Sequence, residues 1–197
     1  PNLRMINLPP GISGKKQAVY FGIQHSKAPY IVTTDADCIP ERGWLRELYL
    51  FLKKNKPVMV SAPVAFTGGY TFFEKWQEME FAGLIAIGAA SIYNRKPNMC
   101  NGANLLYSKE AFHKVNGFAD NIHLLSGDDE FLMHKISLEY PGGVAFLKSK
   151  KALVYTKPAV GLTEFMHQRL RWISKSAYYS EKRITFQLLL SYFFIVQ

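Results

Sequence analysis

The segment from Tyr30 to Asp37 is an apolar, β-branched run that ends in two aspartates, Asp35 and Asp37. Alternate residues of an extended chain point the same way, so both carboxylates are expected on one side of the strand end. In an open α/β sheet, ligands bind at that edge. The two carboxylates repel each other unless a cation lies between them, and a divalent ion with oxygen ligands fits. The alternative is a turn in which an aspartate caps a helix that begins near Pro40.

Strand and helix patterns alternate along the chain, which predicts an α/β fold with a mainly parallel sheet flanked by helices. The apolar content of 48% is enough for a substantial core. No repeat, low-complexity tract or linker divides the sequence, so we expect one domain over residues 1–183. Helices are expected at 14–26, 40–54, 71–93, 108–117, 129–140 and 163–179, and strands at 30–34, 58–65 (interrupted by Pro63), 104–107, 144–147 and 152–156.

The net charge of +9 indicates an anionic partner, such as nucleic acid, nucleotide phosphates or an acidic membrane surface. The basic residues form only short, scattered clusters without a nucleic-acid-binding motif, so no nucleic acid is expected. Cys38 and Cys100 lie far apart and offer neither a disulfide framework nor zinc-ligand spacing, which favours a reducing compartment. The five histidines also lack the spacing of metal ligands.

Three acidic residues, Asp128, Asp129 and Glu130, stand at a predicted helix start, after Ser126 and Gly127. Acids favour the positive end of a helix, and Ser126 with Asp129 is close to a capping box, so capping alone is one interpretation. A cap needs only one carboxylate, however, and three repel one another. Such a cluster raises the pKa of one member, which suits a general base that works near neutral pH.

A third cluster lies in the predicted helix at 163–179. Gln168, Arg171 and Trp172 are spaced i, i+3 and i+4, so they share one helix face. A guanidinium suits phosphate oxygens, and an indole suits the apolar face of a sugar ring. The alternative is an amphipathic surface helix whose tryptophan anchors in the core or at a membrane interface.

Two other features are weaker. Lys15 follows a glycine at a predicted helix start and could reach a phosphate, although the spacing is not that of a Walker loop. Gly102 and Asn104 belong to an Asn-Gly-Ala-Asn segment, which is typical of a turn before a strand.

The apolar segment at 184–197 follows Lys182 and Arg183. It is too short to cross a bilayer, which takes roughly 20 apolar residues. Basic residues before an apolar run are typical of the cytoplasmic flank of a membrane segment, so we expect the start of a transmembrane helix here. The alternative is a C-terminal core helix.

Taken in order, these motifs resemble the family 2 glycosyltransferases. The order is a Gly-Lys helix start, Asp-x-Asp after a strand, Gly-x-Asn, Gly-Asp-Asp and Gln-x-x-Arg-Trp, over residues 11–172. The resemblance is to the membrane-bound members, which include cellulose, chitin and hyaluronan synthases and ceramide glucosyltransferases. It implies the GT-A fold, with the family's N-terminal nucleotide-binding strand expected before Pro1. A chain that lacks this strand is expected to bind nucleotide weakly and to turn over slowly.

The resemblance also implies a role for each matching residue. Asp129 corresponds to the general base, and Asp37 to the residue that holds Mg²⁺ or Mn²⁺ on the donor's diphosphate. Asp128 stands where the family usually has glutamate. The implied nucleotide- and donor-binding residues are Lys15, Asp35, Asp37 and Arg171, and the implied acceptor-binding residues are Gly102, Asn104, Asp128, Gln168 and Trp172.

The function implied is that of an inverting glycosyltransferase. It would move a sugar from a UDP- or GDP-sugar to a hydroxyl of a saccharide or lipid, at the cytoplasmic face of a membrane. Two other classes stay open. A metal-dependent nucleotidyltransferase would also use the aspartate pair and the basic residues, and a non-catalytic carbohydrate-binding module would keep the motifs without the chemistry.

Overall fold

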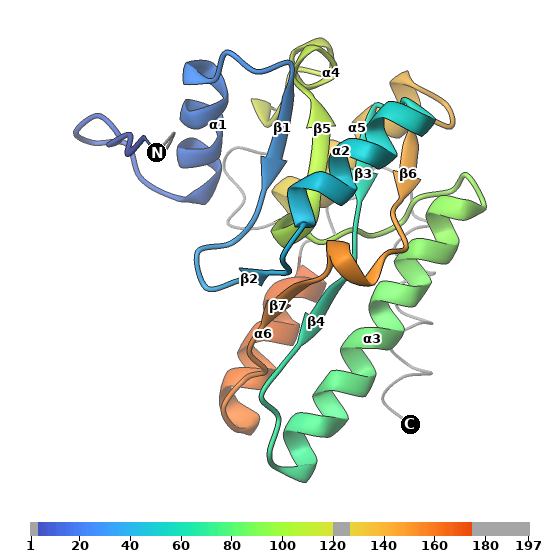
Figure 1. Cartoon of the computed structure of the whole chain (residues 1–197). Helices are drawn as coiled ribbons and strands as arrows, with labels where there is room; N and C mark the ends of the chain where they lie inside the picture. Colours follow the sequence, from blue (N-terminus) through green and yellow to red (C-terminus); the bar gives the residue numbers. More distant parts are fainter. Residues whose placement is uncertain (1–3, 120–126, 175–197) are drawn as a thin grey trace.

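The computed structural model describes residues 4–119 and 127–174. Within them, the chain forms two mixed sheets flanked by helices (Figure 1). The larger sheet has the order β1 (Tyr30–Thr33), β5 (Leu105–Ser108), β3 (Met59–Ser61), β6 (Val144–Phe146). The smaller sheet has the order β2 (Ile39–Pro40), β7 (Val154–Thr156), β4 (Val64–Phe66). The helices are α1 (Lys15–His25), α2 (Trp44–Asn55), α3 (Phe72–Tyr93), α4 (Lys109–Lys114), α5 (Asp128–Glu139) and α6 (Leu162–Ser174).

The predicted α/β fold with flanking helices is confirmed, but the sheets are mixed rather than mainly parallel. Strand β5 is antiparallel to both β1 and β3, and only β3 and β6 are parallel within the larger sheet. The cause is the path of the chain after β3. It continues into β4 and then into α3, and it returns to the edge where β1 and β3 end, so β5 must run back from that edge (Figure 1). Alternation of strands and helices does not encode this direction.

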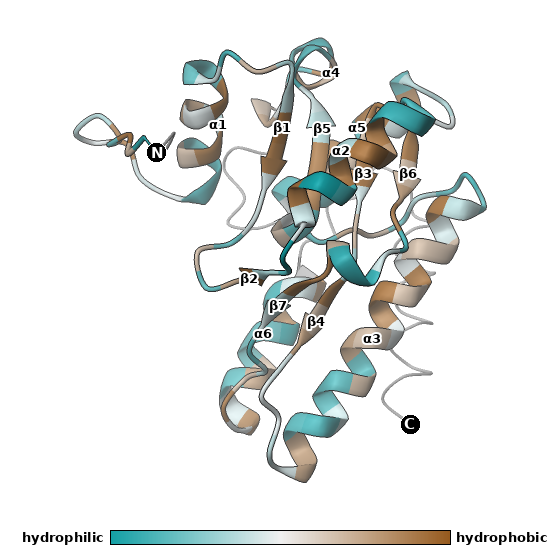
Figure 2. Ribbon diagram, in the orientation of Figure 1, coloured by the Kyte–Doolittle hydropathy of each residue, from teal (hydrophilic) through white to brown (hydrophobic). Residues whose placement is uncertain are grey.

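Side chains of the larger sheet alternate between two apolar layers, as a period of two requires. On one side, Met59 and Tyr107 pack with residues of α1, α4 and α5. On the other side, Val60 and Leu106 pack with Leu48 of α2. Figure 2 shows brown, hydrophobic segments in the strands of this sheet and both brown and teal positions along α2. The sheet is therefore buried on both faces, and its functional groups are left at the edges.

The predicted strand at 58–65 is two strands in two sheets. Pro63 has no N–H for a ladder hydrogen bond and lies between β3 and β4, where the chain passes from one sheet to the other. Strand β3 lies inside its sheet, and β4 lies at an edge of the smaller one. Similarly, the helix expected from Pro40 begins only at Trp44, because Ile39 and Pro40 pair with β7 as strand β2.

Helix α3 matches the predicted helix at 71–93, and a capping box between Thr71 and Glu74 starts it. Its apolar part is buried on one side only: Phe81, Leu84 and Gly88 are buried, whereas the alanines at 82, 86 and 90 are not. None of the helices within residues 4–119 and 127–174 is long and apolar enough to span a bilayer. The segment at 184–197, expected to begin a transmembrane helix, lies outside the described residues.

Candidate active site

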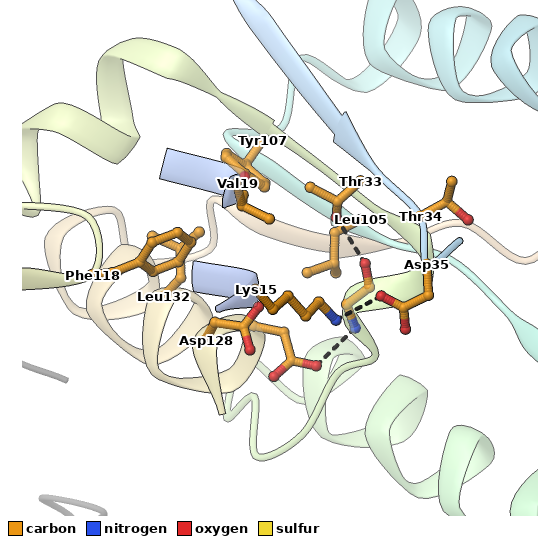
Figure 3. Close-up of a pocket in the computed structure, with 12 residues that line it drawn as sticks. Lys15, Val19, Thr33, Thr34, Asp35, Leu105, Tyr107, Phe118, Asp128 and Leu132 are labelled. Atoms are coloured by element: carbon orange, nitrogen blue, oxygen red, sulfur yellow. Dashed lines mark hydrogen bonds and ion pairs between the residues drawn. The ribbon is translucent and has the colours of Figure 1, made fainter. Parts of the chain in front are cut away.

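A pocket opens at the edge where β1 ends and β5 begins (Figure 3). Its inner wall is apolar and its rim is polar. The apolar wall contains Val19, Leu105, Tyr107, Phe118 and Leu132, and the rim contains Lys15, Thr33, Thr34, Asp35, Gly102, Asp128 and Asp129. Five residues predicted from the sequence therefore meet at one place, although they come from four separate segments of the chain.

Lys15 and Asp35 form an ion pair across the pocket mouth. The Nζ atom of Lys15, in the first turn of α1, lies 2.6 Å from Oδ1 of Asp35, just after β1. Burial lowers the pKa of Lys15, but the hydrogen bond to Asp35 and the charges of Asp128, Asp35 and Asp129 outweigh it, so the pKa is raised. Lys15 is therefore a fixed positive charge among three carboxylates, well placed for a phosphate oxygen.

Asp37 lies beside Asp35, as the sequence predicts, and a third potential ligand joins them. One donor atom each from Asp35, Asp37 and Cys38 lie within 4.8 Å of one another. The sequence did not predict a role for Cys38, because its distance from Cys100 indicates neither a disulfide nor a zinc site. Burial and the two aspartate charges raise the pKa of its thiol. A protonated thiol is a poor ligand, so the site fits a hard divalent ion held through carboxylate oxygens, such as Mg²⁺ or Mn²⁺.

Asp129 lies in the first turn of α5, with both carboxylate oxygens engaged by backbone donors. Oδ2 accepts from the N–H of Gly102 at 2.7 Å, and Oδ1 accepts from the N–H of Glu130 at 2.9 Å. Each carboxylate oxygen has a second acceptor position, so the oriented group can still receive a proton. Burial, and then the charge of Asp129, raises the pKa of Asp128. The expected rise in pKa therefore falls on Asp128, next to the residue implied as the base.

Gly102 connects the strand to the acidic helix. Its carbonyl accepts from Oγ1 of Thr33 at 2.8 Å, while its N–H donates to Asp129. A Cβ atom at this position would meet Oδ2 of Asp129 at 3.3 Å, which is tighter than ordinary contact. The glycine thus allows the close approach that holds the Asp129 carboxylate at the pocket rim.

Asn104 does not line the pocket, in contrast to the role implied for it. Its side chain is fully buried. The amide donates to the carbonyls of Pro63 and Ala152, both at 2.8 Å, and Oδ1 accepts from the indole of Trp44 at 2.9 Å. Both N–H groups of the amide and its oxygen are therefore engaged with the two sheets and α2, and Asn104 supports the site from within.

The Gln168–Trp172 cluster on α6 lies outside the pocket lining. Trp172 is half-buried and packs, as does Cys38, against the cluster of Val64, Phe66, Phe81 and Ala103. Arg171 is exposed. Arg169, between the predicted residues, is buried and paired with Glu80 of α3. The sequence analysis did not predict a role for Arg169 or Glu80, although Glu80 stands directly before the apolar helical run that begins at Phe81.

The chain is similar to several solved structures. Three are complexes of glucosyl-3-phosphoglycerate synthase from Mycobacterium tuberculosis: with Mn²⁺ and UDP-glucose, with Mn²⁺, UDP and glucosyl-3-phosphoglycerate, and with phosphoglyceric acid. Their TM-scores are 0.47, 0.48 and 0.49, at 12–13% identity over 85% of this chain. The chain spans about half the length of these proteins, 54–55%.

The sequence was also compared with curated proteins and with family profiles. No curated protein matches. The profile of glycosyl transferase family 2 matches residues 1–115, which is more than half of the chain and includes Lys15, Asp35, Asp37 and Gly102. The α/β fold is of the GT-A type that such transferases have. The chain belongs to glycosyl transferase family 2.

Proposed function

We propose that this chain carries the transfer site of an inverting glycosyltransferase that uses a nucleotide-diphosphate sugar. The observation that carries the proposal is the meeting of Lys15, Asp35 and Asp129 around one pocket, in a chain of this family. A transfer site of this kind needs a cation for phosphate, oxygen ligands for a metal and a carboxylate base within one pocket. The described residues supply all three.

Asp129 is the proposed base. It accepts the proton of the acceptor hydroxyl, whose oxygen attacks the anomeric carbon as the bond to the diphosphate oxygen breaks. Attack from the face opposite the leaving group inverts the anomeric configuration. Backbone N–H groups donate to both carboxylate oxygens of Asp129, so the carboxylate is held in one orientation. Asp128, whose pKa is raised by burial, lines the same pocket and is a proposed contact for the acceptor.

Asp37 is the proposed metal ligand. It is exposed, and it lies with Asp35 in a cluster whose oxygen donors suit Mg²⁺ or Mn²⁺. When bound, such an ion neutralises charge on a diphosphate leaving group. Lys15 holds its charge next to that cluster, and we assign it to the diphosphate or the nucleotide.

Helix α6 is the proposed second wall of the site. Trp172 and Cys38 both pack against the cluster of Val64, Phe66, Phe81 and Ala103, so α6 and the segment that carries the aspartate pair rest on one apolar cluster. The indole of Trp172 suits the apolar face of an acceptor sugar. We assign Arg171 to the diphosphate and Gln168 to the acceptor. We also propose that the chain belongs to the membrane-bound subgroup and uses a saccharide or lipid acceptor at the cytoplasmic face of a membrane. This assignment is supported by an exposed apolar stripe on α6, formed by Leu162, Met166 and Leu170.

The product distinguishes the proposed function from the two alternatives. The chain is incubated with UDP- or GDP-sugars, Mn²⁺ and a panel of saccharide and lipid acceptors. Release of nucleoside diphosphate together with a glycosylated product supports transfer. Pyrophosphate released from a nucleoside triphosphate would identify a nucleotidyltransferase instead.

A matched pair of variants tests the base. Asp129→Asn should abolish transfer, because the carboxamide cannot take a proton. Its single oxygen can accept from the N–H of Gly102 or of Glu130 but not from both, so the Tm should fall modestly while the fold is kept. Glu139→Gln removes an exposed carboxylate of the same helix, which pairs with Lys114, and should leave transfer unchanged. Saccharide binding without turnover, indifferent to Asp129→Asn, would identify a non-catalytic module.

A further inference from the structure

Helices α3 and α6 are joined by an ion pair that is buried at both ends. The side chain of Glu80 is 1% exposed and that of Arg169 is 7% exposed. The guanidinium binds both carboxylate oxygens: Nε donates to Oε1 at 2.9 Å, and Nη2 donates to Oε2. A two-point contact between planar groups fixes the orientation of the arginine as well as its position.

The same guanidinium contacts the two functional side chains of α6. Its Cζ lies 4.3 Å from the ring centroid of Trp172 and 4.3 Å from that of Phe165, so it lies between two aromatic faces. Its third nitrogen, Nη1, donates to Oε1 of Gln168. All three guanidinium nitrogens of Arg169 are thus engaged, either with the buried carboxylate of Glu80 or with Gln168, which is proposed to bind the acceptor.

A contribution to the stability of the fold does not by itself explain why a charged pair, Glu80 and Arg169, is buried between α3 and α6. Burying two charges costs free energy that their attraction only partly recovers, and apolar residues of similar size usually serve stability as well. A second attachment already exists one turn away. The fully buried amide of Gln77 exchanges two hydrogen bonds with the backbone of Ala159, both at 3.0 Å, and so ties α3 to the segment before α6. What the ion pair adds is a fixed orientation of the Arg169 guanidinium.

We propose that Arg169, oriented by Glu80, is a positioning residue that fixes the indole plane of Trp172 and the amide of Gln168 for the acceptor sugar. The inference rests on the proposed function of α6. Among the described residues, Trp172 also contacts the ring of Phe81, at 5.9 Å between centroids, and packs against the cluster that contains it, while the guanidinium of Arg169 lies over the indole ring. Gln168, with its oxygen held by Arg169, presents its N–H groups as donors for a sugar hydroxyl.

The test uses the full chain labelled with 5-fluorotryptophan, in which the ¹⁹F resonance of Trp172 is assigned with Trp172→Phe. Three variants are compared: Arg169→Met, Arg169→Lys and the double variant Glu80→Met/Arg169→Met. Lys114 and Glu139 form an exposed ion pair between other helices, so Glu139→Gln serves as the matched control.

Arg169→Met leaves a buried carboxylate without its partner, so its Tm should fall. The double variant removes both charges and should recover most of the Tm. If the pair positions the site, the double variant still shows a displaced Trp172 resonance, and its KM for the acceptor rises by about a hundredfold while the KM for the donor stays unchanged. Arg169→Lys keeps the charge but not the fork, and should show the same displacement.

The two proposals fail separately. A double variant with the wild-type Trp172 resonance overturns the positioning role, as does one with wild-type kinetics. A wild-type chain that transfers no sugar overturns the proposed function, and the ¹⁹F spectrum then still decides whether Arg169 orients Trp172.

Discussion

At the scale of single residues, the sequence was most informative where a side chain breaks a periodic pattern. Asp35 and Asp37 follow the end of an apolar strand, and Asp129 exceeds what a helix cap needs. The structure places Asp35 and Asp129 in one pocket and Asp37 beside it. Glu80 and Arg169 escaped notice because a charge within a helix fits an exposed position equally well. Only packing of α3 on α6 shows that both are buried.

The raised pKa of Asp128 predicts a pH-dependent stability. The folded protein keeps the Asp128 proton to a higher pH than the unfolded chain does. Stability is therefore lost as the pH rises from the usual aspartate range through the raised pKa, and it stays lower above that pKa. Asp128→Asn removes the titrating carboxyl and therefore this loss of stability. The Tm of the variant should rise relative to that of the wild type as the pH is raised from about 4 to about 8. A Tm difference that is constant across this range would contradict the prediction.

The exposed position of Asp37 predicts a change in metal affinity without a change in fold. Asp37→Ala should weaken Mn²⁺ binding by about tenfold or more, measured by electron paramagnetic resonance of the free ion, while the Tm stays the same. Cys38→Ser is the matched variant. Because the raised pKa keeps the thiol protonated, this variant should bind Mn²⁺ as the wild type does. Loss of affinity in Cys38→Ser would make the thiol a ligand.

At the scale of elements, the helices were predictable and the strand pairing was not. Helix α3 was found with both ends, and α4 begins at the Ser108 cap and stops before Gly117 as expected, because caps and periodicity are local signals. The split of 58–65 between two sheets depends on Asn104, Trp44 and Ala152, which lie far away in the sequence. No local pattern contains that information.

Asn104 predicts a large loss of stability from one substitution. Asn104→Leu leaves the carbonyl of Ala152 and the indole N–H of Trp44 without their partner, whereas the carbonyl of Pro63 still accepts from the N–H of Val154 at 3.2 Å. At roughly 1–3 kcal/mol for each unpaired group, the loss should be about 2 kcal/mol or more. Urea unfolding measures it. Asn55→Leu removes an exposed amide that bonds only to its own helix and should change stability little, so equal effects of the two substitutions would refute this role.

At the scale of the whole molecule, each sheet contributes one part of the proposed site. The larger sheet carries the Asp35 end of β1 and the Gly102 turn before β5, and the smaller sheet begins directly after Asp37 and Cys38. Helix α6 packs on the smaller sheet through Trp172. Family membership could be inferred from the order of motifs alone, because that order reflects the path of the chain from one part of the site to the next.

The ion pair between Lys15 and Asp35 predicts that the proposed metal site and the proposed nucleotide site depend on each other. In the protein by itself, each group is the other's counter-ion. A divalent cation at Asp35 alone leaves Lys15 without its carboxylate, and a diphosphate at Lys15 alone leaves Asp35 without its ammonium. When both ligands bind, both charges are compensated again. Positive cooperativity between the two ligands follows, and by linkage it must be equal in both directions.

Calorimetric titration can measure this cooperativity. UDP should bind more tightly with Mn²⁺ present than without it, and Mn²⁺ should gain the same factor from UDP. Lys15→Met removes the internal counter-ion and should reduce the factor while leaving Mn²⁺ affinity equal or higher. Affinities that are independent of the other ligand would show that the pair persists in the complex. If the coupling is found, the apparent nucleotide affinity of this protein is set by the metal concentration around it.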